Sequence, residues 1–307
     1  MKAVRLYEYG GPEVLKYEED APEPTLDADS VLIEAAATSV NPVDWKIRSG
    51  TRQKDFPLKF PAILGMDVSG VVRAVGLNVR TFKPGERVLA CAGATYAGVV
   101  TVKESALTHL PDGLDLIDAA AIPLVVLTGD QLVRLVCRVQ AGQTLLVSGA
   151  LGSVGRAAVH AARKLGASVI AGVRSGRLAQ ARALGVADTV AIDDDAAIAA
   201  LAMVDAVADT VGGETAAKLF GKVKNGGIFG YASVLPEGVA QRNPAVTVTR
   251  VFARPDPSKV REFADDIRDG KFQLPISRRW PLREAGKAHA LAQQGGAGKI
   301  VLVCRDA

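Results

Sequence analysis

The sequence predicts a two-domain α/β protein in which a partly open β-barrel precedes a doubly wound parallel sheet. Short β-prone segments separated by turn residues fill the chain as far as Leu110. A strand, a glycine turn and a helix follow one another between Thr144 and Gly166. Strands and helices then alternate as far as Val251, which is typical of a parallel sheet with helices on both faces.

The N-terminal region is punctuated by clusters of glycine and proline. Gly10-Gly11-Pro12 and Lys83-Pro84-Gly85 are examples. The strand candidates between such turns are Lys2–Tyr7, Ser30–Ala37, Asp67–Val75, Arg87–Ala90 and Val99–Val102. Regularly spaced short strands favour a barrel.

The middle region begins with a predicted helix over Thr128–Val139, and we assign residues 123–257 to this second domain. Its predicted strands are Thr144–Ser148, Ser168–Val173, Thr189–Ile192, Asp205–Asp209, Gly227–Tyr231 and Val246–Phe252. The helices predicted between them are Arg177–Leu184, Asp195–Leu201 and Glu214–Lys222.

The C-terminal region predicts a helix over Ser258–Asp269, a short helix over Leu282–Gln293 and a last strand over Lys299–Val303. That strand has no sheet partner nearby in the sequence. We therefore expect it to return to the barrel, so that the first domain is discontinuous and comprises residues 1–122 and 258–307.

The glycine turn is the strongest motif. The second and third glycines of the dinucleotide fingerprint G-x-G-x-x-G are present as Gly152 and Gly155. Ala150 stands at the position of the first glycine, and Gly149 before it can serve the tight turn. The helix begins inside the turn, so the backbone N–H groups of Ser153 and Val154 are expected to hold a pyrophosphate. The alternative is an ordinary strand-to-helix turn.

The end of the next strand indicates which dinucleotide is bound. An NAD site usually carries an acid about 20 residues beyond the first glycine. This chain has Arg174, Ser175 and Arg177 in that region. Two guanidinium groups and a hydroxyl suit a 2′-phosphate, which predicts NADPH. The alternative is that both arginines are solvated surface charges.

Composition excludes several classes of protein. The formal net charge of the 307 residues is +4, and no basic tract predicts nucleic-acid binding. Three distant cysteines indicate neither a disulfide framework nor a zinc cluster, and we expect a cytoplasmic protein. We see no signal peptide and no apolar run long enough to cross a membrane.

Several motifs together resemble the zinc-less quinone oxidoreductase branch of the medium-chain dehydrogenase/reductase superfamily. They are Gly10 to Leu15 (GGPEVL), Asn41 to Lys46 (NPVDWK), Ile63 to Val72 (ILGMDVSGVV), Phe82 to Val88 (FKPGERV), the glycine turn, and Gly298 to Leu302 (GKIVL). The resemblance covers essentially the whole chain. It implies a GroES-like barrel and a Rossmann domain.

The same resemblance implies that the protein uses no metal. Zinc enzymes of this fold take a Cys and a His ligand from the barrel, and the matching positions here are Asn41 and Met66, neither of which suits Zn²⁺. The expected reaction is hydride transfer from NADPH to a quinone or an α,β-unsaturated carbonyl, as in classes EC 1.6.5 and 1.3.1.

Charge develops on the substrate oxygen in such a reaction, so a hydrogen-bond donor is needed there. Lys46 is the first candidate and Tyr96 the second; Asn41 is expected to face the nicotinamide ribose or the substrate. Each also has an ordinary interpretation, because Asn41 begins an Asn-Pro turn and Lys46 can be a solvated lysine.

The remaining contacts with the cofactor are implied by the resemblance. Thr128 is expected at the ribose, and Lys299 either reaches the phosphates or only begins the last strand. Asp193 stands where relatives often carry an aromatic residue near the adenine. Apart from the resemblance, Tyr231, Ala232 and Ser233 come just after a predicted strand, at the carboxyl edge of the sheet, and are expected at the nicotinamide side. The resemblance implies that the loop around Val251 and Phe252 closes over the cofactor, with a core position as an equal alternative for Phe252.

Three functions remain open at this point. The first is an NADPH-dependent quinone or enone reductase that acts as a homodimer, without nucleic-acid or membrane partners. The second is an enoyl-thioester reductase of the same superfamily. The third is a non-enzymatic NADPH-binding protein, such as a sensor or a crystallin-like relative.

Overall fold

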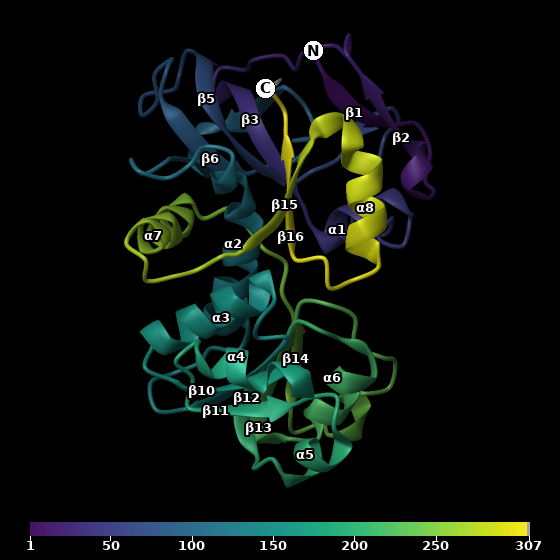
Figure 1. Ribbon diagram of the computed structural model, residues 1–307, viewed down its shortest axis with the longest axis vertical. Coiled ribbons are helices and arrows are strands. Elements are labelled where there is room, and N and C mark those ends of the chain that lie inside the picture. The colour runs from purple at the N-terminus through teal and green to yellow at the C-terminus, as the bar shows by residue number, and fades with distance from the viewer. Residues whose placement is uncertain (306–307) are drawn as a thin grey trace. The chain divides into compact units, whose positions relative to one another are not determined.

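The computed structural model describes residues 1–305 of the chain. These residues form two compact units, one made of Met1–Leu124 together with the chain from Pro255 onward, the other of Val125–Arg254 (Figure 1). The first unit is therefore assembled from two separate stretches of sequence. The expected boundaries, after residues 122 and 257, lie close to those of the two units.

A mixed sheet forms the centre of the first unit. Its strands follow the order β15-β16-β3-β5-β6-β8, and β7 also pairs with β3. The bounds are β3 Ser30–Val40, β5 Asp67–Val75, β6 Arg87–Cys91, β7 Val99–Lys103, β8 Leu107–His109, β15 Ile276–Pro281 and β16 Lys299–Val303. Glu34 is the one exposed residue of β3, so this strand runs through the core. Ile33 of this strand belongs to the same buried cluster as Val68 and Leu302.

The last strand, β16, pairs with β3. The antiparallel register runs from Ile300 opposite Val40 to Val303 opposite Ala37. The other edge of β16 pairs in parallel with β15, a strand that the sequence had not indicated. The return of β16 carries Lys299 into the interior of the unit, where it is 3% exposed.

Smaller elements complete the first unit. A three-stranded sheet has the order β2-β1-β4, with bounds β1 Ala3–Leu6, β2 Leu15–Glu18 and β4 Ala62–Ile63. The helices are α1 Pro42–Arg48, α7 Pro257–Arg268 and α8 Ala285–Gln293. Helix α1 follows β3 directly, because Asn41 provides the cap and Pro42 suits the first helical turn.

The second unit is a six-stranded parallel sheet in the order β11-β10-β9-β12-β13-β14. The strands are β9 Thr144–Ser148, β10 Ser168–Val173, β11 Asp188–Ala191, β12 Val204–Asp209, β13 Val223–Tyr231 and β14 Thr247–Arg250. The helices are α3 Ser153–Lys164, α4 Leu178–Arg182, α5 Asp195–Ala200 and α6 Gly213–Phe220. In Figure 1, α3 and α4 lie on one side of this sheet and α5 and α6 on the other. The predicted doubly wound sheet is therefore present, and its strand order reverses at β9.

Helix α2 differs from its prediction. It spans Pro123–Gln131 and continues as a π-helical turn over Leu132–Val136, whereas the sequence predicted Thr128–Val139. The earlier start follows from Pro123, because proline suits the first helical position. The helical stretch Asp118–Val136 is long and apolar enough to cross a membrane, but 72% of its apolar window is buried in the protein, as in a core helix.

Candidate active site and cofactor site

The glycine turn of the second unit leaves the N-terminus of α3 open. Gly149 has φ +67°, which favours glycine, and a Cβ on Gly155 would collide with the carbonyl oxygen of Gly149. Gly152 is the N-cap, and no side chain among the described residues caps the helix. The first N–H groups of α3 are therefore available to an anion.

A buried hydrogen-bond network fixes the loops beside this turn. Ser148 Oγ at the end of β9 donates to Asp209 Oδ1 at the end of β12, at 2.5 Å. Asp209 Oδ2 accepts from the Gly212 N–H at 2.9 Å, and Thr210 Oγ1 donates to the Ser148 carbonyl at 2.7 Å. Burial raises the pKa of Asp209. Sequence reasoning missed this network, although an acid at the end of a buried parallel strand was a usable signal.

Other predicted cofactor residues lie at the carboxyl edge of the same sheet. Tyr231 at the end of β13 is half-buried, as are Ala232 and Ser233 after it. The Ala232 N–H donates to the Asp209 carbonyl at 2.8 Å. Thr128 is half-buried on α2, and Val251 is buried. Three apolar side chains in the loops that follow β12, β13 and β14 are exposed, namely Val211 (43%), Val234 (54%) and Phe252 (51%). Phe252 is therefore not a core residue in this structure.

Arg174, Ser175 and Arg177 follow β10 and are all exposed. The Arg177 Nε donates to Gln180 Oε1 at 2.7 Å, and no partner of the Arg174 guanidinium is found among residues 1–305. Ser175 already contacts a carboxylate, because its N–H donates to Asp193 Oδ1 at 2.7 Å. The predicted 2′-phosphate site thus holds both cations and an acid.

In the first unit, Asn41 belongs to a buried polar cluster with Lys299 and Asp67. Lys299 Nζ donates to Asn41 Oδ1 at 2.7 Å, and Asn41 Nδ2 donates to Asp67 Oδ2 at 2.7 Å. Asp67 also accepts from Ser39 Oγ at 2.5 Å and from the Leu124 N–H at 2.6 Å. Burial lowers the pKa of Lys299, and Asp67 opposes that shift. In this structure the Lys299 ammonium contacts Asn41 and Asp67.

A second buried chain of polar groups adjoins this cluster through Asp44. Asp44 Oδ2 accepts from the Asn41 N–H at 2.7 Å and from the Tyr96 hydroxyl at 3.0 Å. The same hydroxyl lies 2.9 Å from His289 Nε2 on α8. Burial raises the pKa of Asp44 to about 7 and lowers that of His289 to about 3. Tyr96 is fully buried, so this placement favours a positioning role over direct contact with a substrate.

Lys46 lies on α1, apart from these clusters. Its ammonium sits 5.4 Å from the centre of the Trp45 ring, and no carboxylate partner is found in the described chain. Burial, followed by the nearby Arg52 charge, lowers its pKa. A half-buried ammonium without an acid partner retains donors for a ligand.

No group of three or more His, Cys, Asp or Glu side chains that could hold a metal occurs among residues 1–305. The three cysteines are buried as free thiols. Burial raises the pKa of Cys137 and of Cys304 to about 12 and also raises that of Cys91, which disfavours the nucleophilic thiolate form of all three.

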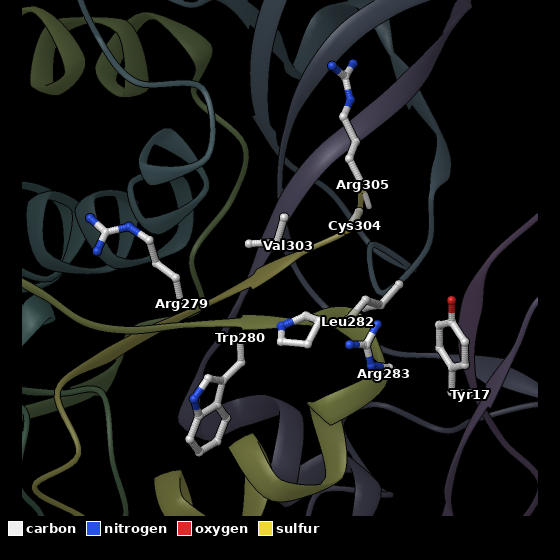
Figure 2. Close-up of a pocket in the computed structure, with 9 residues that line it drawn as sticks. Tyr17, Arg279, Trp280, Leu282, Arg283, Val303, Cys304 and Arg305 are labelled. Carbon is white, nitrogen blue, oxygen red and sulfur yellow. The ribbon is translucent and has the colours of Figure 1, made fainter. Parts of the chain in front are cut away.

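A surface cavity of ≈ 380 Å³ in the first unit contains none of the predicted site residues. Figure 2 shows that its side chains diverge, because Trp280, Arg279 and Arg305 point in three different directions. The Arg279 guanidinium is held by both oxygens of Asp118 at 2.6 Å. We therefore treat two candidate sites separately, namely the polar clusters of the first unit and the glycine turn of the second unit.

Comparison with known proteins agrees with this architecture. Residues 27–112 match the family model described as alcohol dehydrogenase GroES-like domain, and residues 184–302 match that of zinc-binding dehydrogenase. A quinone oxidoreductase from Pseudomonas aeruginosa is 33% identical over 98% of this chain and 99% of its own. The chain belongs to the quinone oxidoreductase family of the medium-chain dehydrogenase/reductase superfamily. The resemblance recognised in the sequence is thereby confirmed.

Other members of the superfamily match over shorter stretches. The human quinone oxidoreductase is 41% identical over 58% of this chain, and the chain spans about half (54%) of that relative's length. An Arabidopsis thaliana protein named NADPH-dependent alkenal/one oxidoreductase, chloroplastic, is 36% identical over 60% of this chain and 50% of its own.

Solved structures of the quinone oxidoreductase family have the same fold. The quinone oxidoreductase from Coxiella burnetii superposes with a TM-score of 0.87 at 27% identity, over 99% of both chains. A mycobacterial protein solved in complex with NADPH superposes with a TM-score of 0.84 at 27% identity, over 99% of this chain and 100% of its own. The predicted GroES-like and Rossmann folds are confirmed.

Proposed function

We propose that this protein is a metal-free oxidoreductase that uses NADPH to reduce a quinone or an α,β-unsaturated carbonyl compound. The observation that carries the proposal is the open N-terminus of α3 behind a turn that only glycine fits at Gly149 and Gly155. A pyrophosphate suits such a helix end, because its backbone N–H groups and the helix dipole both favour an anion.

Two observations support NADPH as the dinucleotide. Arg174 and Arg177 are exposed cations at the end of β10, where a 2′-phosphate lies in sites of this kind. The mycobacterial relative was solved with NADPH.

In this proposal the cofactor and the residues of the protein contribute different parts of the reaction. Bound nicotinamide would supply the hydride, and the protein would position the acceptor and stabilise the charge that develops on its oxygen. Lys46 is suited to that stabilisation, because its ammonium has no acid partner in the described chain. Asn41 is held from both sides by Lys299 and Asp67, so its amide has a fixed orientation.

The proposal predicts no metal requirement. Asn41 and Met66 stand where the zinc enzymes of this fold carry their ligands, and an amide and a thioether are poor ligands for zinc. We expect activity to survive dialysis against a chelator. A stoichiometric metal whose removal abolishes activity would contradict this part of the proposal.

The decisive experiment mixes the purified protein with NADPH or NADH and a panel of quinones, enones and 2-enoyl thioesters. Oxidation is followed by the absorbance of the reduced nicotinamide. We expect turnover with quinones or enones. Turnover with thioesters alone would favour an enoyl-thioester reductase, and tight NADPH binding without any turnover would favour a non-enzymatic role.

A further inference from the structure

The acid nearest to the predicted 2′-phosphate site comes from a neighbouring strand. The parallel register pairs Val173 at the end of β10 with Ala191 at the end of β11, and the Ile192 N–H donates to the Val173 carbonyl at 2.9 Å. Two residues beyond Val173 lies Ser175, and two residues beyond Ala191 lies Asp193. The sheet register therefore sets these two side chains opposite each other.

The contact between them uses both donors of Ser175. Its backbone N–H donates to Asp193 Oδ1 at 2.7 Å, and its hydroxyl donates to Asp193 Oδ2 at 3.2 Å. The Asp193 carboxylate thus occupies the hydrogen-bond donors that a 2′-phosphate would require. No basic partner of Asp193 is found within residues 1–305.

The charged groups at this edge of the sheet therefore favour two different ligands. Arg174 and Arg177 attract a phosphate, whereas the carboxylate of Asp193 repels it. A ribose 2′-OH, in contrast, can donate a hydrogen bond to a carboxylate, which is how NAD sites select their ligand. NAD sites usually carry this acid at the end of the second strand of the domain, which is β10 here, and the end of β10 has no acid. Asp193 follows β11, the third strand, and offers a carboxylate acceptor from that position.

We infer that Asp193 sets the preference between NADPH and NADH, by accepting from the 2′-OH of NADH and by competing with the 2′-phosphate of NADPH for Ser175. This inference rests on the proposed use of a nicotinamide dinucleotide. It predicts that the wild-type protein binds both dinucleotides, with a smaller preference for NADPH than the arginines alone would give.

The test measures dissociation constants of NADPH and NADH for the wild type and for Asp193→Asn, by fluorescence of the reduced nicotinamide or by calorimetry. The variant keeps an acceptor for Ser175 and removes the charge. We expect binding of NADPH to tighten roughly tenfold and binding of NADH to weaken. The gain for NADPH should shrink in molar salt, where charges are screened over about 3 Å.

Asp188→Asn is the matched control, because Asp188 is the first residue of β11, at the end opposite to the one that Asp193 follows, and is also exposed. It changes the net charge equally and should leave the ratio of the two dissociation constants unchanged. If the ratio of the two dissociation constants is unchanged in Asp193→Asn, or changes equally in both variants, the inference about Asp193 is overturned but the proposed function is not. A wild-type protein that binds neither dinucleotide would overturn the proposed function as well.

Discussion

The Lys299 ammonium donates a hydrogen bond to the Asn41 carbonyl oxygen at 2.7 Å, across 258 positions of the sequence. The other end of the same amide donates to Asp67 Oδ2 at 2.7 Å. A cation at the oxygen and an anion at the nitrogen leave the amide one favourable orientation. Lys299 and Asp67 are therefore positioning residues for Asn41, and all three are buried.

Breaking the buried ion pair between Lys299 and Asp67 should destabilise the first unit. Lys299→Met leaves the Asp67 charge uncompensated, which costs about 3–5 kcal/mol in comparable buried pairs. Adding Asp67→Asn removes the orphaned charge, so the double variant should recover much of the loss. Both tryptophans, Trp45 and Trp280, lie in this unit, so their fluorescence during urea unfolding reports the change. A double variant no more stable than Lys299→Met would contradict the pairing.

Lys46→Ala should lower kcat/KM on the order of 10²-fold if its ammonium stabilises charge on the substrate oxygen. The fall should appear mainly in kcat, because the interaction strengthens in the transition state. Lys54→Ala is the control, since Lys54 is an exposed lysine a few residues further along. An unchanged rate for Lys46→Ala would remove Lys46 from the mechanism.

Gly155→Ala should weaken dinucleotide binding and lower the stability of the second unit by about 1–3 kcal/mol, as overpacking does. The added Cβ meets the Gly149 carbonyl, which cannot move without opening the turn. Gly221→Ala provides the comparison, because its nearest atom would be the Lys218 carbonyl oxygen at 3.4 Å. Calorimetry with and without NADPH measures both effects, and equal behaviour of the two variants would refute the steric argument.

His289 should make stability depend on pH. Its pKa in the folded protein is lowered from 6.5 to about 3 by burial. Between these values the unfolded chain binds the additional proton, so the contribution of His289 to stability increases as pH rises from about 3 to 6.5, by at most about 1.4 kcal/mol per unit. Above that range it is constant.

The comparison that isolates this effect is with His289→Gln. The free energy of unfolding of the wild type, relative to the variant, should rise with pH below 6.5 and then level off. Tryptophan fluorescence in urea at several pH values measures it. A difference that is independent of pH would show that His289 does not titrate in this way.

Local patterns predicted the βα units well. The bounds of β9 and β10 agree with the expected Thr144–Ser148 and Ser168–Val173, because apolar runs and turn residues are local signals. Strand β15 was missed, since Ile276–Pro281 contains two arginines and a proline and lies at the sheet edge.

Sequence patterns could not pair the buried residues of the site. Tyr96 and His289 are 193 positions apart, and Asn41 and Lys299 even further. The Asn41–Lys299 contact depends on which strand β16 joins and in which register, and the Tyr96–His289 contact depends on where α8 packs. No local pattern carries that information. The Ser175–Asp193 contact is likewise a consequence of the pairing between β10 and β11.

The place of β16 beside β3 also governs the order in which the chain can fold as it is synthesised. The second unit is continuous, from Val125 to Arg254, and can fold while the rest is still being made. The first unit must wait, because Asp67 lacks its buried cation until Lys299 leaves the ribosome. An incomplete chain would thus hold the formed parallel sheet of the second unit and an unfinished first unit.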